Sequence, residues 1–289
     1  MTLVRCADLL ADAHGGGRAV AAFNVITLEH AQAVAAGAAA AGAPAVLQVS
    51  QNAVAHHGRL EPLAAALTAL ARGSGAALAL HLDHVTDEAL LRAAPAAGFG
   101  SVMFDGSRLP YAGNVAATAA AVRFAHRHGL LVEAELGRIG GKPGDAHTPG
   151  VRTDPAEAAE YVRDTGVDAL AVAVGSSHAM TRRTAALDHA LIARLRAALG
   201  VPLVLHGSSG VPDAELRRGV AAGLTKINVG TALNVSLTGA VRDRLAADPE
   251  GVDPRRWLAA GRAAMTETVE RLLRVLDGTR GGLTGPCSP

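Results

Sequence analysis

Residues 78–90 read LALHLDHVTDEAL, and this stretch passes from an apolar run to helix-forming sequence. A continuous apolar run is typical of a strand that is covered on both faces of a parallel sheet. The run ends in His81, Asp83 and His84. Two interpretations are open for these polar residues: an ordinary polar strand end, or a metal ligand beside a general base.

The same change from strand to helix recurs along the chain. Apolar runs predict strands at residues 19–25, 45–50, 77–83, 101–105, 131–137, 169–175, 203–207 and 226–230. Ala-rich segments predict helices at residues 28–41, 60–72, 87–97, 114–128, 154–165, 187–199, 213–222 and from 232 onward. Eight strand-helix units in about 250 residues predict an α/β fold, the (β/α)8 TIM barrel. A doubly wound open sheet is the alternative, but FNVITLEH (23–30) contains no GxGxxG turn.

The C-terminal part of the chain extends beyond this repeat. Residues 248–289 predict an additional helical segment, with a loosely ordered tail over 279–289. We expect residues 1–289 to form a single domain, because barrels of this length commonly fold as one unit.

The composition argues against several classes of protein. The 27 Lys and Arg residues against 26 Asp and Glu residues give a net charge of +1, which provides no field toward nucleic acid or an anionic membrane. Aromatic residues make up only 2% of the chain, too few for a platform that stacks bases. The N-terminus has no apolar signal-peptide core, and Cys6 and Cys287 lack metal-type spacing. We expect a cytoplasmic protein without nucleic-acid or membrane partners.

Polar residues gather where the predicted strands end, which is the active-site end of such a barrel. They are Asn24, Ser50, Asp83, His84, Asp105, Glu135, His178, His206, Asn228 and Thr231. Three of them, His84, His178 and His206, belong to different strands, and three neutral imidazoles with an open fourth position make a catalytic zinc site. Each histidine alone is more often an ordinary hydrogen-bonded side chain. His81 shares the strand face of Asp83, opposite His84, and we assign His81 to packing or to the support of a ligand.

Two glycine-containing loops follow the predicted seventh and eighth strands. One carries Gly207, Ser208, Ser209 and Gly210, and the other carries Asn228, Val229, Gly230 and Thr231. Loops at these positions commonly bind phosphate through backbone N–H groups and a helix N-terminus. Either loop alone is equally well explained as a tight turn. Both together, next to His206, favour a phosphate site.

Five longer motifs contain most of these residues. They are HLDH (81–84), VEAELGRIGG (132–141), VAVGSSH (172–178), LVLHGSSGVPD (203–213) and KINVGTAL (226–233). From AFNV (22–25) to about residue 270, the chain resembles the class II, metal-dependent ketose-bisphosphate aldolases, in particular the tagatose- and fructose-bisphosphate branch. The resemblance implies reversible cleavage of fructose 1,6-bisphosphate or tagatose 1,6-bisphosphate into dihydroxyacetone phosphate and glyceraldehyde 3-phosphate.

The resemblance also implies roles for individual residues. It makes Asp83 the acid/base that takes the C4 hydroxyl proton. The implied metal ligands are His84, His178, His206, Glu135 and Asp105. The three histidines hold one Zn2+ ion, which acts as a Lewis acid on the ketone oxygen, and the two acids bind a second or displaced divalent cation. The implied substrate contacts are Asn24, Ser50, Ala179, Gly207, Ser208, Ser209, Asn228, Val229, Gly230 and Thr231.

Two further partners follow from the resemblance alone. A monovalent cation, Na+ or K+, is expected near the phosphate. A homodimer or homotetramer is expected as the assembled form.

The chain departs from the family pattern at two places. Ala179 follows His178 where the family usually has a His-Gly pair, which puts the conformation of that loop in question. Where relatives carry acidic residues for proton exchange, this chain reads Lys142, Pro143, Gly144 and Asp145. Asp145 is a substitute candidate for that proton transfer; the alternative is that the proton travels by another group.

Two other functions remain open from the sequence. Schiff-base chemistry needs a lysine, and Lys226 in the eighth predicted strand is the candidate, although it lies at the start of that strand and leaves the histidines unexplained. The altered loops at Ala179 and Pro143 would also suit a non-catalytic barrel that binds sugar phosphate or supports an aldolase as a partner subunit. A non-catalytic subunit, however, has no need for Asp83 beside an open metal site.

Overall fold

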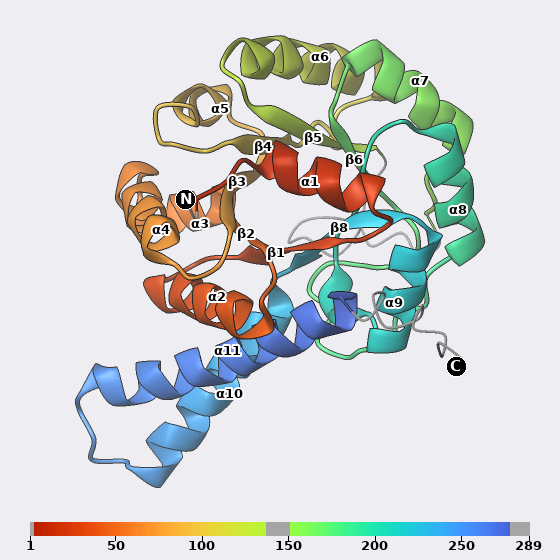
Figure 1. Ribbon diagram of the computed structural model, residues 1–289. Helices are drawn as coiled ribbons and strands as arrows, with labels where there is room; N and C mark the ends of the chain where they lie inside the picture. The colour runs from red at the N-terminus through yellow and green to blue at the C-terminus, as the bar shows by residue number, and fades with distance from the viewer. Residues whose placement is uncertain (1–2, 137–150, 278–289) are drawn as a thin grey trace, which may run out of the picture.

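The strands of the protein close into a barrel (Figure 1). A computed structural model of the protein describes residues 3–136 and 151–277. Parallel strands within these ranges are paired in chain order, and β8 pairs back to β1: β1 (Val20–Asn24), β2 (Ala45–Ser50), β3 (Leu78–Val85), β4 (Ser101–Phe104), β5 (Leu131–Leu136), β6 (Ala169–Val172), β7 (Leu203–Leu205) and β8 (Leu224–Val229). The predicted (β/α)8 TIM barrel is therefore confirmed.

Helices surround the strands in Figure 1. Within the described ranges they are α1 (Cys6–Gly15), α2 (Leu28–Ala41), α3 (Gln51–His57), α4 (Glu61–Gly73), α5 (Glu88–Ala93), α6 (Tyr111–Arg127), α7 (Pro155–Thr165), α8 (His189–Ala198), the short 3-10 helix η1 (Ser208–Gly210), α9 (Asp213–Ala222), α10 (Thr231–Ala247) and α11 (Pro254–Asp277). The bounds of α2 and α9 agree with the prediction to the residue. α5 ends four residues earlier than predicted, at Ala93, because Pro95 has no backbone N–H to continue the helical hydrogen bonds.

α1 was not predicted, although its apolar residues recur with helical spacing. Cys6, Leu10 and Ala13 are all buried, and they pack in one cluster with Val20 and Val46 at the starts of β1 and β2. In Figure 1, α1 crosses the open end of the barrel. α1 therefore closes the end of the barrel at which the strands begin.

The C-terminal helices extend the barrel fold. α10 and α11 form a pair that projects away from the strands, and α11 then returns to lie along α2 (Figure 1). A Cβ atom on Gly37 of α2 would lie 2.7 Å from Cγ1 of Val269, so the absence of a side chain lets the two helices approach. The additional C-terminal helix is thus confirmed, while the predicted tail over 279–289 lies outside the described residues.

Among the helices of residues 3–136 and 151–277, none combines the length and the apolar character needed to cross a membrane.

An irregularity in β3 redirects one side chain. The pairing of β3 with β4 shifts register between Leu82 and Val85, and His84 has a left-handed backbone with φ 51°. The two-residue period of a regular strand predicts that His84 faces away from Asp83. This prediction is wrong, because His84 and Asp83 line the same cavity. The strained backbone turns the imidazole of His84 toward the mouth of the barrel.

Candidate metal centre and active site

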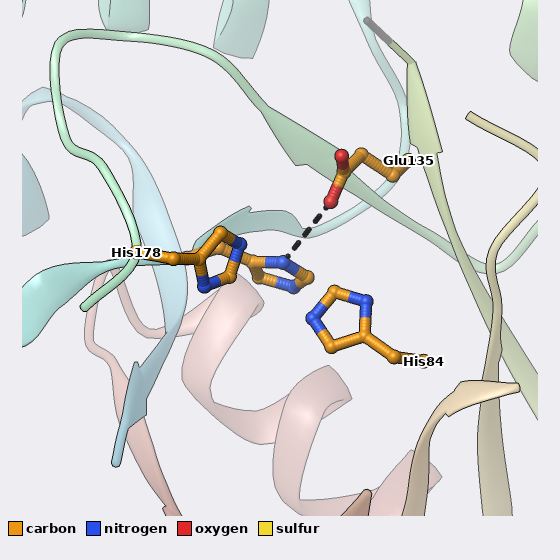
Figure 2. Close-up of side chains that lie close together, drawn as sticks. His84, Glu135 and His178 are labelled. Carbon is orange, nitrogen blue, oxygen red and sulfur yellow. Dashed lines mark ion pairs between the residues drawn. The ribbon is translucent and has the colours of Figure 1, made fainter. Parts of the chain in front are cut away.

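Three histidines from three strand ends converge at the mouth of the barrel. His84 belongs to β3, His178 follows β6, and His206 follows β7 directly. Their ring centroids are 5.4 Å apart for His84 and His178, 4.9 Å for His84 and His206, and 5.6 Å for His178 and His206. Figure 2 shows His84, His178 and Glu135 of β5 directed toward one space. One ligand atom from each of these four residues lies within 4.8 Å of the others.

Carboxylates orient two of the rings. Asp105 lies 2.9 Å from Nδ1 of His84, and Glu133 of β5 lies 2.9 Å from Nε2 of His206. When the N–H of one imidazole nitrogen is donated to a carboxylate, the other nitrogen carries the lone pair that binds metal. This leaves Nε2 of His84 and Nδ1 of His206 for the shared space.

The donor set fits a zinc ion. Three imidazole nitrogens and one carboxylate oxygen are ligands that Zn2+ prefers. Burial alone would lower the pKa of His206, but hydrogen bonds with Glu133 and Glu135 raise this pKa to about 9. In the metal-free protein His206 therefore holds a proton, which metal binding must release.

Asp105 takes a different position from Glu135. Oδ2 of Asp105 contacts Nδ1 of His84, and Oδ1 accepts hydrogen bonds from the backbone N–H and the hydroxyl of Ser107. Glu135, by contrast, lies 3.2 Å from Nδ1 of His206 and belongs to the group of ligand atoms. Asp105 therefore orients the imidazole of His84. The binding of a second cation by Asp105 stays a prediction.

Asp83 lies beside the histidines and is buried. Its Oδ2 accepts a hydrogen bond of 3.1 Å from Gln48 and lies 3.8 Å from Nε2 of His84. Its Oδ1 has no hydrogen-bond partner within the described part of the chain. Burial acts to raise the pKa of Asp83, but the charges of His84 and His206 outweigh this effect and lower it. Asp83 is therefore a carboxylate at the cavity wall whose buried Oδ1, 3.8 Å from Nε2 of His81, keeps an unused acceptor position.

A buried polar layer lies beneath this site. The three N–H groups of Lys226 face three acceptors: Oε2 of Glu133 at 2.7 Å, Oε1 of Gln48 at 3.1 Å and Nε2 of His81 at 3.4 Å. All four side chains are buried. Because an ammonium group has three donors, Lys226 is fully satisfied. Glu133, which orients His206, is in turn neutralised by Lys226.

The charges in this layer follow from burial and from Lys226. Burial and the positive charge of Lys226 lower the pKa of His81 to about 3, so His81 stays neutral. Burial opposes ionisation of Glu133, but Lys226 lowers the pKa of Glu133 and keeps this residue anionic. His81, Asp83 and Glu133 form a second group of potential metal ligands. Lys226 contacts two of these three residues, so its ammonium group takes the place of a metal there.

The sequence carried a signal for this layer that was missed. Gln48, Glu133 and Lys226 each precede a predicted rim residue by two positions on the same strand: Ser50, Glu135 and Asn228. Side chains two apart on a strand share a face, so a rim of polar residues implies a second layer below it. From the sequence, His81 is the one residue of this layer that is assigned to packing or to the support of a ligand.

The two glycine loops meet in one cavity. It has a volume of about 200 Å3, and its lining residues are Asn24, Ile26, Gln48, Ser50, Asp83, His84, His178, Ala179, Gly207, Ser209, Asn228, Gly230, Thr231 and Asn234. Gly207 has φ 68°, and a Cβ atom there would overlap with the backbone of Ser177. Ser209 accepts a hydrogen bond of 3.1 Å from the backbone N–H of Ala232 in α10, which links the two loops.

Most predicted substrate contacts line this cavity, and two do not. Ser208 and Val229 are buried outside the cavity lining, and the hydroxyl of Ser208 donates to the carbonyl of Asn228. Oδ1 of Asn228 is buried and has no hydrogen-bond partner among residues 3–136 and 151–277. Asp145, together with Lys142 and Pro143, lies outside the described residues.

Ala179 adopts a backbone conformation that favours glycine. Its φ is 57°, in the left-handed region, and Ala179 lines the cavity next to His178. The loop therefore keeps this shape although a Cβ atom makes the shape unfavourable.

Replacing Ala179 with glycine is expected to raise the free energy of unfolding by about 1 kcal/mol, because glycine has no Cβ strain at positive φ. Thermal or chemical denaturation measures this change. The matched control is Ala65→Gly on the exposed face of α4, which should lower the free energy of unfolding by about 1 kcal/mol. Equal destabilisation at both positions would contradict strain at Ala179.

Comparison with known proteins places the chain among related folds. A family model described as fructose-bisphosphate aldolase class-II matches residues 4–280. The structure is similar to the YdjI aldolase from Escherichia coli K12, with 29% identity, a TM-score of 0.81 and coverage of 95% of this chain and 97% of that chain. It is also similar to a putative fructose-1,6-biphosphate aldolase from Coccidioides immitis, with 28% identity, a TM-score of 0.85 and coverage of 95% and 96%.

A third structure supports the fold alone. Fructose-bisphosphate aldolase (Fba) from Campylobacter jejuni shares 21% identity, with a TM-score of 0.80 and coverage of 95% of each chain. The family match includes all the strands of the barrel and every histidine of the candidate metal centre. The chain therefore belongs to the class II fructose-bisphosphate aldolase family and is an enzyme of the lyase class.

Proposed function

We propose that the protein is a zinc-dependent aldolase that reversibly cleaves a ketose bisphosphate. The substrate is fructose 1,6-bisphosphate or tagatose 1,6-bisphosphate, and the products are dihydroxyacetone phosphate and glyceraldehyde 3-phosphate. One observation carries this proposal: His84, His178 and His206 surround a common space beside the buried carboxylate of Asp83. The same cavity is lined by both glycine loops, which supports a phosphorylated substrate.

Asp83 is the proton-transferring group in this proposal. It takes the proton of the C4 hydroxyl as the C3–C4 bond breaks, so that C4 becomes the aldehyde carbon, and the electron pair of the bond stays with the ketone fragment. Gln48 holds Oδ2 of Asp83, and Oδ1 is the acceptor. In the reverse reaction Asp83 returns the proton.

His84, His178 and His206 would hold the zinc ion. When bound, Zn2+ supplies Lewis-acid polarisation of the ketone oxygen of the substrate. Asp105 and Glu133 keep the rings of His84 and His206 in their orientation. We further propose Asp145 for proton transfer at the ketone fragment.

The glycine loops would bind the phosphate of dihydroxyacetone phosphate. Gly207 and Ser209 of one loop line the cavity, as do Gly230 and Thr231 at the N-terminus of α10. Such groups attract anions because helix N-termini carry unsatisfied N–H groups and a partial positive charge.

The remaining features of the proposal rest on family membership. We propose one catalytic Zn2+, with Glu135 and Asp105 available to a second divalent cation, and a monovalent cation, Na+ or K+, near the phosphate. We also propose a single catalytic domain, a homodimer or homotetramer, and a cytoplasmic location.

Removal of the divalent metal with a chelator is expected to lower the release of dihydroxyacetone phosphate by at least about 10³-fold, since a Lewis acid supplies several kcal/mol of transition-state stabilisation. Added Zn2+ should restore the rate. The melting temperature should fall on chelation, because a ligand of the folded state stabilises that state.

Two variants control this experiment. His84→Ala should lose the response of the melting temperature to chelation. His126→Ala, on the surface at α6, should respond as the unaltered protein does. Full activity after complete removal of metal would refute the zinc-dependent mechanism.

Schiff-base chemistry on Lys226 is not favoured. The sequence places Lys226 at the start of the eighth strand. In the structure β8 begins at Leu224, so Lys226 lies within the strand. Its amine is buried and makes three hydrogen bonds with acceptors. A Schiff base needs a neutral amine that meets the substrate. A non-catalytic barrel that only binds sugar phosphate would not explain why the carboxylate of Asp83 lies beside the three histidines.

A further inference from the structure

The active-site cleft has a second lobe. A cavity of about 310 Å3 adjoins the one that contains the glycine loops, and both are lined by Asn24, Ser50, His84 and His178. The second lobe is also lined by Gln51, Asn52, Thr86, Asp105 and Arg108. His84 and His178 of the candidate metal centre therefore lie where the two lobes meet.

The two lobes differ in their chemistry. The first contains both glycine loops, which suit the phosphate of the ketone fragment. The second lobe is lined by the amide of Asn52 and by Gln51, which donates a hydrogen bond to the hydroxyl of Thr86, and such polar groups suit a chain of hydroxyl groups. Among the described residues that line either lobe, Arg108 is the one with a permanent positive charge.

We infer that Arg108 determines specificity for an aldehyde fragment that carries an anionic group at its far end. A substrate whose reacting carbonyl lies at the histidines, and whose ketone-side phosphate lies at the glycine loops, must extend its other half into the second lobe. The planar guanidinium of Arg108 binds phosphate or carboxylate through two parallel hydrogen bonds.

This inference rests on the proposed function and adds the residue that recognises the far end of the aldehyde. Arg108 is exposed, in the segment between β4 and α6. Replacing it is therefore expected to leave the fold intact, and thermal denaturation verifies this for each variant. Arg108→Gln removes the charge, and Arg108→Lys keeps the charge but removes the paired donors.

The experiment measures condensation of dihydroxyacetone phosphate with three aldehydes: glyceraldehyde 3-phosphate, succinic semialdehyde and glyceraldehyde. Arg108→Gln should lower kcat/KM by about 100-fold with an anionic aldehyde and far less with neutral glyceraldehyde. The larger loss among the two anionic aldehydes identifies phosphate or carboxylate as the group that Arg108 binds. Arg108→Lys should lie between Arg108→Gln and the unaltered protein. KM for dihydroxyacetone phosphate should stay the same, because its phosphate lies in the other lobe.

The matched control is Arg123→Gln on the exposed face of α6, whose side chain lines a separate cavity between α5 and α6. This variant should match the unaltered protein with all three aldehydes. Equal losses with charged and neutral aldehydes, or a raised KM for dihydroxyacetone phosphate, would overturn the role of Arg108.

Failure of the proposed function gives a different result. If the unaltered protein condenses none of the aldehydes, the proposed function fails. Calorimetric binding of glyceraldehyde 3-phosphate, with dihydroxyacetone phosphate present at saturation, then decides the role of Arg108. The inference holds if Arg108→Gln weakens this binding by about 100-fold and is overturned if both proteins bind alike.

Discussion

Asp83→Asn is expected to lower the rate of ketose-bisphosphate cleavage by about 10³-fold, within the range of a lost general base. Asparagine keeps the size of the side chain and an oxygen that accepts the hydrogen bond from Gln48. It cannot take the proton of the C4 hydroxyl. A coupled assay for released dihydroxyacetone phosphate measures the rate, and metal analysis of the same sample measures zinc content.

The expected pattern separates chemistry from metal binding. Zinc content should change little, because Asp83 is not a member of the group formed by the three histidines and Glu135. Asp243→Asn, an exposed position on α10, is the matched control and should keep full activity. A rate for Asp83→Asn above one tenth of the control rate would refute the assignment of Asp83 as the base.

Lys226→Met is expected to lower the free energy of unfolding by about 3–5 kcal/mol, the usual effect of removing one partner from a buried ion pair. Methionine leaves Oε2 of Glu133 in the barrel interior without the ammonium group that it contacts. It also leaves acceptors on Gln48 and His81 without a donor. Denaturant titration measures the loss.

A double variant tests the cause of this loss. Lys226→Met combined with Glu133→Gln removes both charges and should recover part of the stability lost in the single variant. It should still bind zinc more weakly than the unaltered protein, by about 10- to 100-fold, because the carboxylate that orients His206 is gone. A double variant less stable than Lys226→Met would show that the charge of Glu133 is not the source of the loss.

The barrel was predictable because its strands are buried on both faces. Runs such as LALHLD and ALAVAV lack the alternation of a half-exposed strand, and each run is followed by a helix. The helix ends were predictable where they carry capping residues, as at Asp154, whose side chain accepts hydrogen bonds from the start of α7. α1 was missed because no strand precedes it and its three buried residues give a short pattern.

The candidate site was predictable as a set of residues but not as a geometry. Position at strand ends identified His84, His178, His206 and Asp83, because parallel strands deliver their ends to one rim. The direction of the His84 side chain depends on a left-handed backbone conformation, which the two-residue alternation of a regular strand does not predict. The partners of Lys226 come from three other strands, so their meeting follows from the closure of the barrel and not from local sequence.

The position of α1 has a consequence for the entry and release of ligands. Cys6, Leu10 and Ala13 cover the end where the strands begin, and buried side chains such as Lys226 and Glu133 fill the barrel interior. Ligands therefore enter and leave at the end of the barrel that carries the histidines. A product that stays bound near this end blocks release of the other product. The order of product release, and inhibition by the product that dissociates more slowly, therefore depend on which fragment lies nearer the outside.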